Sequence, residues 1–181
     1  MMPTHGTTAF RSLTIGSVTE AVLRRTEAPV WTSAHCEDGG PVPLDYRAVV
    51  CAVDLGPASA HVLRAAADFA AGFGAVLHVM HAQPGHSSTF ATATSEMAHR
   101  YLLDEARRAW PPIAEAAGLP AATPLAMAEE PEIVDGICGF AERQSADLLV
   151  IGRGVSQGVL GRLRTHAHDL IRRTRCPVLS V

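Results

Sequence analysis

The chain has 181 residues, 48% of them hydrophobic and 18% charged, and its formal net charge is −3. This is enough apolar material for one core but short for two complete domains, and the charge gives no general electrostatic footprint for nucleic acid. No stretch approaches the ~18 apolar residues that span a bilayer, and residues 1–11 lack the apolar run of a signal peptide. We therefore expect a soluble, cytoplasmic protein that binds neither nucleic acid nor membrane.

The first thirty residues repeat the last thirty in one ungapped register. Residues 23–30 (LRRTEAPV) align with 171–178 (IRRTRCPV), and the offset is 148 residues throughout. That offset is about the length of one α/β domain, so the chain reads as the tail of one repeat followed by a complete second repeat. From the C-terminal copy, the repeat predicts a helix over 17–26 and a strand over 28–33, with Pro29 at the break between them.

From residue 47 the sequence alternates between strand-like and helix-like blocks. Residues 47–54 (RAVVCAVD) form a nearly continuous apolar run, which is typical of a parallel strand buried on both faces. Residues 58–72 carry apolar side chains at helical spacing, and 75–81 form a second strand, which completes a β-α-β unit. Residues 84–94 are rich in small and polar residues without periodicity, so we expect a mobile surface loop there.

The second half continues this alternation. We expect a helix over 95–117 whose path Pro111 and Pro112 kink, and then a strand over 122–128. Two acids and a proline at 129–131 suit the N-terminus of the next helix. The remaining predicted elements are a strand over 147–152, a helix over 160–174 and a strand over 176–181.

Alternating strands and helices with short connections imply a parallel sheet that is covered by helices on both faces. Ligands of such sheets bind at the carboxyl ends of the strands. Asp54, which ends the first strand, and the loop that begins at Gly152 should therefore share one rim of the sheet.

Three segments, in this order and at this spacing, resemble the universal stress protein (UspA) family. They are 52–55 (AVDL), 146–152 (ADLLVIG) before a glycine loop, and 175–179 (RCPVL) near the C-terminus. The resemblance covers all of 47–181, and residues 2–34 resemble the C-terminal third of a second such domain.

The resemblance implies a three-layer α/β/α fold of the adenine nucleotide alpha hydrolase-like type. Its five-stranded parallel sheet would have the strand order 3-2-1-4-5, with 147–152 beside 47–54. The implied organisation is a remnant of a first repeat at 1–34, a linker at 35–46 and a complete domain at 47–181.

The ATP-binding branch of the family carries the motif Gly-x2-Gly-x9-Gly-Ser/Thr after the fourth strand. Glycines let the backbone approach phosphates, while the helix N-terminus and a hydroxyl supply donors. Gly154 matches the second glycine and Thr165 the hydroxyl, but Arg164 replaces the third glycine. The first glycine falls on Ile151, with Gly152 one place late. Arg164 could neutralise a phosphate, but its side chain more readily blocks the close approach. We therefore expect that ATP is not bound tightly.

The N-terminal copy keeps the motif spacing but lacks the rest of the site. Gly6, nine further residues and then Gly16-Ser17 match the family, with Pro3 in place of the first glycine. The strand and the aspartate that would complete this site do not precede it. Three explanations stay open: a gene model that starts late, a tandem protein that has lost its front, or a segment that serves as a structural appendage.

Asp54 corresponds to the family residue that faces the nucleoside, but it equally fits a strand-ending acid in a helix-capping turn. Other candidate sites are weaker. The histidine pairs 78/81 and 166/168 diverge, no serine lies in a Gly-x-Ser-x-Gly elbow, and the four cysteines form no C-x-x-C pair. The sequence therefore predicts no catalytic residue and no metal site.

Two classes of function remain. The first is a stress-response module that acts through dimerisation and partner contacts and needs no cofactor; the second is an adenine-nucleotide-binding switch, with ATP as ligand and with or without slow hydrolysis. A nucleotidyl transferase is disfavoured because the sequence lacks His-x-Gly-His. In the family, domains pair through the last strand, so we expect 29–33 to lie antiparallel to 177–181, within the chain as a pseudo-dimer or across a homodimer.

Overall fold

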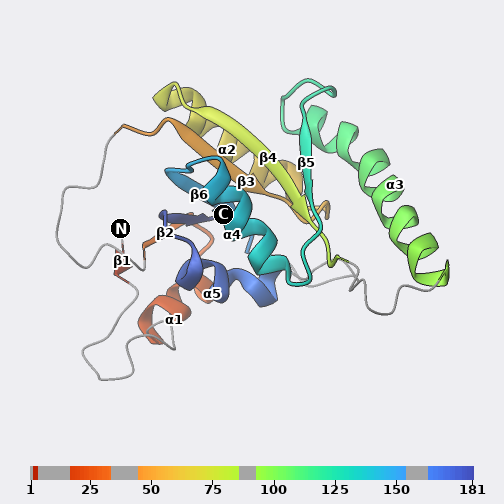
Figure 1. Ribbon diagram of the computed structural model, residues 1–181. Coiled ribbons are helices and arrows are strands. Elements are labelled where there is room, and N and C mark those ends of the chain that lie inside the picture. Colours follow the sequence, from red (N-terminus) through yellow and green to blue (C-terminus); the bar gives the residue numbers. More distant parts are fainter. Residues whose placement is uncertain (1, 4–16, 34–44, 86–92, 154–162) are drawn as a thin grey trace.

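A computed structural model describes residues 2–3, 17–33, 45–85, 93–153 and 163–181. They form three layers, with α2 and α3 on one face of a seven-stranded sheet and α1, α4 and α5 on the other (Figure 1). The strands are β1 Met2–Pro3, β2 Val30–Ser33, β3 Ala48–Ala52, β4 Val76–Ala82, β5 Leu125–Ala128, β6 Leu148–Ile151 and β7 Val178–Ser180. The helices are α1 Ser17–Arg25, α2 Ser59–Phe73, α3 Ala93–Ala116, α4 Ile133–Arg143 and α5 Leu163–Arg173.

The sheet has the order β1-β2-β7-β6-β3-β4-β5. The five strands of the C-terminal domain run parallel to one another, and in domain numbering their order is 3-2-1-4-5, as predicted. β6 lies beside β3, with Val49 opposite Leu148. The sheet is two strands wider than the five predicted, because β1 and β2 extend it beyond β7.

The N-terminal segment adds a helix and two strands to this domain. α1 and β2 occupy the predicted helix and strand, and β2 begins directly after Pro29. β2 runs antiparallel to β7, with Val30 opposite Ser180 and Thr32 opposite Val178. β1 runs parallel to β2, just as β6 runs parallel to β7. The β1-α1-β2 unit therefore reproduces β6-α5-β7 on the other side of an antiparallel junction.

Side chains of β3 alternate between two cores, one on each face of the sheet. Val50 packs against α4 and α5, and Val49 and Cys51 pack against α2 and α3; all three are completely buried. An apolar residue at every position is the pattern of a parallel strand covered on both faces. The N-terminal segment joins the second core through Trp31, whose ring centroid lies 5.5 Å from that of Phe69.

Several element ends differ from the prediction. β5 begins at Leu125 rather than 122, because residues 121–122 form a turn in which the Thr123 amide donates to the Pro120 carbonyl. α3 continues to Ala116 with Pro111 and Pro112 inside it. Most of the loop expected over 84–94 lies outside the described residues. Within the described part of the chain, no helix has the length and hydropathy needed to cross a membrane.

Candidate functional site: the rim at the carboxyl ends of β3 and β6

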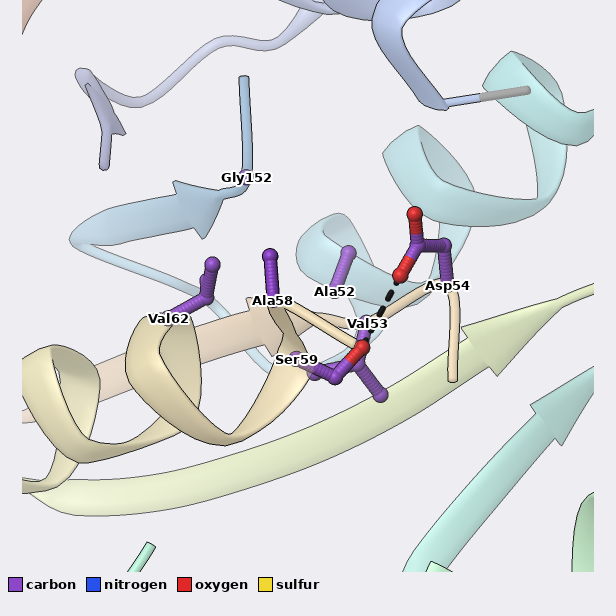
Figure 2. Close-up of a pocket in the computed structure, with 7 residues that line it drawn as sticks. All are labelled: Ala52, Val53, Asp54, Ala58, Ser59, Val62 and Gly152. Carbon is purple, nitrogen blue, oxygen red and sulfur yellow. Dashed lines mark hydrogen bonds between the residues drawn. The ribbon is translucent and has the colours of Figure 1, made fainter. Parts of the chain in front are cut away.

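The carboxyl ends of β3 and β6 meet at one rim of the sheet, as predicted from their parallel pairing. Figure 2 shows the small cavity between them, which has a volume of about 10 Å³. This is room for about one water molecule. The cavity is lined by Ala52, Val53, Asp54, Ala58, Ser59, Val62 and Gly152.

The Asp54 carboxylate closes the turn between β3 and α2. Its Oδ1 atom accepts hydrogen bonds from the Gly56 amide and the Ser59 hydroxyl, both at 2.9 Å (Figure 2 draws the second). Ser59 is 2% exposed and is the first residue of α2. Asp54 therefore closes the turn that precedes α2, but it does not cap that helix, because no side chain bonds to the helix amides at the N-cap residue Ala58. Among the described residues, no hydrogen bond is made to its Oδ2 atom.

Leu55, inside this turn, has a φ of +58°. A left-handed backbone costs a non-glycine residue roughly 1–2 kcal/mol and persists only where the surroundings impose it. A Cβ atom on Gly56 would lie 3.1 Å from Asp54 Oδ1, so a larger residue there would displace this carboxylate by a few tenths of an ångström. The local sequence therefore holds the Asp54 carboxylate in one position at the rim.

His81, near the end of β4, reaches the same rim from the neighbouring strand. Its Nδ1 atom lies 2.9 Å from the Val53 carbonyl and the residue is 8% exposed, so a neutral ring with the proton on Nδ1 donates to that carbonyl. Burial lowers the pKa of His81, against smaller opposing effects of this hydrogen bond and of Asp54. From the sequence, His81 is visible only as half of a histidine pair that is too divergent to bind a metal. The described residues hold no cluster of His, Cys, Asp or Glu that is placed to bind a metal ion.

Arg153 follows Gly152 and anchors the start of the glycine loop to the N-terminal segment. Its amide donates to the Val181 carbonyl at 3.0 Å. Its guanidinium donates to three successive carbonyls just beyond α1, those of Thr26, Glu27 (3.1 Å) and Ala28 (2.7 Å). A cation at a helix C-terminus is favourable because the last carbonyls carry partial negative charge. Sequence reasoning missed this residue, although an arginine between the two loop glycines was a visible signal.

The structure brings two of the predicted site residues together, Asp54 and Gly152. Three predicted loop glycines lie outside the described residues: Gly6, Gly16 and Gly154. Three more predicted residues belong to helices in which their side chains are outside the described part: Ser17 at the start of α1, and Arg164 and Thr165 in the first turn of α5.

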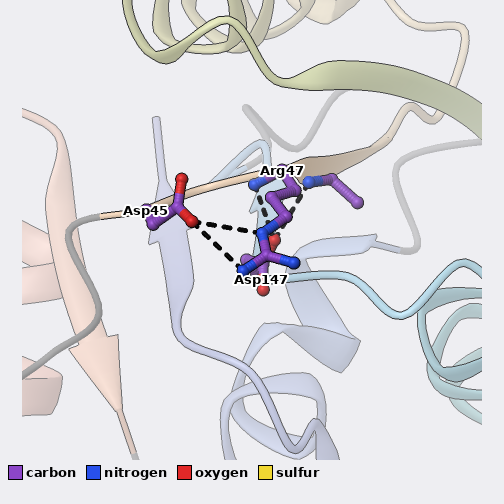
Figure 3. A network of polar contacts seen from close by, with 4 residues as sticks. Asp45, Arg47 and Asp147 are labelled. Carbon is purple, nitrogen blue, oxygen red and sulfur yellow. Dashed lines mark hydrogen bonds and ion pairs between the residues drawn. The ribbon is translucent and has the colours of Figure 1, made fainter.

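At the opposite end of the sheet, Asp147 fastens β6 to β3. Its Oδ2 atom accepts hydrogen bonds from the backbone amides of Arg47 and Ala48 at 2.7 and 3.0 Å (Figure 3). The side chain of Arg47 forms an ion pair with Asp45 at 3.2 Å, and both are largely exposed. Asp147 thus fixes the register of β3 and β6 at this end of the sheet. This register places Asp54 and Gly152 beside each other at the opposite end, where the two strands finish.

Comparisons with known proteins agree with this fold. The sequence model of the universal stress protein family matches residues 45–181. No curated protein sequence matches the chain significantly. A universal stress protein solved in complex with cAMP is 26% identical, with a TM-score of 0.53, over 76% of this chain and 97% of that one.

Two longer solved structures match 99% of this chain, each with a TM-score of 0.65, and show the same fold. They are a functionally unknown protein from Pseudomonas aeruginosa PAO1, 19% identical, and a putative universal stress protein from Pseudomonas aeruginosa UCBPP-PA14, 21% identical. The chain spans 61% of the length of either. The match of the family model over the whole C-terminal domain, together with the strand order and the rim, shows that this chain belongs to the universal stress protein family.

Proposed function

We propose that this chain is a cytoplasmic stress-response module that acts through protein contacts and requires neither catalysis nor tightly bound ATP. One observation carries the proposal: in the described part of the rim, the Asp54 carboxylate is engaged by its own turn, through the Gly56 amide and the Ser59 hydroxyl.

Two further features support a role in contacts rather than in phosphate binding. The guanidinium of Arg153 is directed to the carbonyls that follow α1, so this positive charge of the glycine loop serves the N-terminal segment. β2 lies along the edge of β7, where it supplies inside one chain the antiparallel contact that the family resemblance assigns to paired domains. We propose that this junction acts as an internal pseudo-dimer.

Calorimetric titration of the full chain with Mg-ATP tests the proposal. We expect no binding tighter than about 0.1 mM, which corresponds to about −5.5 kcal/mol. Arg164→Gly is the comparison, because it restores the third glycine of the family motif. Asp54→Asn is the matched control, since the amide oxygen can still accept from the Ser59 hydroxyl. Micromolar binding by the unaltered chain that is lost in Asp54→Asn would overturn the proposal.

A second candidate function is adenine-nucleotide binding. It is favoured by the 26% identity to a universal stress protein that was solved in complex with cAMP. A simple experiment distinguishes the two candidate functions. The purified protein is denatured, and the supernatant is examined by ultraviolet absorbance and chromatography for adenine nucleotide that co-purified with it. Stoichiometric adenine nucleotide in that supernatant would select the second candidate, and its absence would select the first.

A further inference from the structure

One face of α1 forms an open groove of about 540 Å³. The groove is lined by Val18, Ala21, Val22, Arg25 and Thr26. Val18 is 68% exposed. Arg25 is exposed and has no acidic partner among the residues that the structure describes. The face thus combines apolar side chains with one uncompensated positive charge.

The internal repeat shows what such a face binds. In the C-terminal copy, the equivalent face of α5 is covered by α4. Leu170 there is completely buried, the guanidinium of Arg173 pairs with Asp135, and the hydroxyl of Thr174 lies 3.6 Å from the sulfur of Cys138. Asp135 and Cys138 are three residues apart on α4, so both lie on the side of that helix that meets α5.

The constant offset of 148 residues identifies the residues of α1 that correspond to this interface on α5. It pairs the groove residues Val22, Arg25 and Thr26 with Leu170, Arg173 and Thr174. The side of α1 that faces the core also corresponds: Thr19 is 3% exposed and Leu23 packs against the cluster that contains Ile171. α1 therefore lies on the sheet next to α5 in the same manner (Figure 1), and the side that differs is the one that α4 covers in the C-terminal copy.

We propose that the groove on α1 is a docking surface for an amphipathic helix of another polypeptide, of the same type as α4. The helix would present apolar residues to Val18 and Val22 and an aspartate or glutamate to Arg25, with a small residue three positions after the acid, near Thr26. This inference rests on the proposed function in protein contacts and names the surface and the partner's chemistry.

The test uses the full chain and a helix-stapled peptide with the sequence of residues 131–145, because an unstapled peptide of this length is only marginally helical. Amide chemical-shift mapping should show saturable changes at α1. Arg25→Glu should weaken binding about tenfold, as expected for the loss of a charge pair and the gain of a like-charge contact. A peptide with Asp135→Arg should restore binding to the Arg25→Glu chain.

Two variants keep the test decisive if one substitution also perturbs the fold. Val18→Glu changes a largely exposed side chain, so the chain should fold and still lose the peptide. Arg108→Glu on α3 introduces the same change in net charge on an exposed arginine elsewhere and should bind normally.

Three results would overturn the inference. They are binding that is indifferent to Val18→Glu and Arg25→Glu, shift changes on α5 that indicate displacement of α4, and self-association of the full chain through α1, which would make a second copy the occupant. None of them depends on ATP, so a failure of the docking surface stays distinguishable from a failure of the proposed function.

Discussion

Replacing Arg153 with alanine should loosen the N-terminal segment from the rest of the molecule. The guanidinium donates to the carbonyls of Thr26, Glu27 and Ala28, the last two at 3.1 and 2.7 Å. Glu27 and Ala28 are exposed, so their carbonyls regain water, and each bond is assigned only about 0.5 kcal/mol. The interaction of the cation with the C-terminus of α1 adds about 0.5 kcal/mol. The total is about 2 kcal/mol, or about 30-fold in the equilibrium for local opening.

Native-state hydrogen exchange measures this opening residue by residue. We expect the amide of Leu23 in α1 to exchange about 30-fold faster in Arg153→Ala, while the amide of Val62 in α2 keeps its protection. In Arg153→Lys, the exchange rate of the Leu23 amide should lie between those of the unaltered chain and of Arg153→Ala. A lysine ammonium keeps the positive charge, but it cannot donate to three carbonyls as the planar guanidinium does. Equal acceleration at Leu23 and Val62, or none at either, would refute the idea that Arg153 holds the N-terminal segment.

Three other substitutions probe buried groups. Ser180→Ala should stabilise the fold by up to about 1 kcal/mol in urea unfolding, since the Ser180 hydroxyl is buried and no described residue hydrogen-bonds to it. Thr32→Val should instead cost about 1 kcal/mol, because the Thr32 hydroxyl donates to the Val178 carbonyl at 3.2 Å; equal effects of both changes would contradict this reasoning. Burial lowers the pKa of His81 below 6.5, so under about pH 6.5 the unfolded chain binds a proton that the folded chain rejects. Stability should therefore fall as the pH drops through this range, and His81→Gln should flatten that dependence in urea titrations at several pH values. Burial raises the pKa of Cys51 to about 12, so mass spectrometry should find its alkylation limited by unfolding, and rapid labelling of the native protein would show the burial to be wrong.

The strands of the C-terminal domain could be predicted from apolar runs, whereas their order came from the resemblance to the universal stress protein family. Residues 47–54 and 147–152 have no polar position inside the run, and this pattern is typical of strands covered on both faces. The repeat predicted the existence of α1 and β2, and the expected place of β2 beside β7 came from the way in which domains of the family pair. Element ends were less predictable, as at β5, where a turn takes the first residues of an apolar stretch.

The chemistry of the rim could be predicted only in part. An aspartate after a strand suits both a nucleoside contact and a turn, and the choice depends on whether Ser59 begins a helix close enough to donate to it. The role of Arg153 could not be predicted, because its carbonyl partners lie 125 to 127 residues away in the sequence. Local patterns describe elements, whereas these contacts exist only after the sheet has assembled.

The junction between β2 and β7 has a consequence for how the protein responds to its own abundance. Separate chains associate to an extent set by their concentration, but two edges on one chain meet at an effective concentration of about millimolar when the connection is short. β2 belongs to the same chain as β7, so dilution does not separate them. The fraction of molecules in which β2 is paired with β7 therefore does not depend on the expression level of the protein. A response at this edge requires a competing strand that displaces β2, and its threshold is set by the concentration of that competitor.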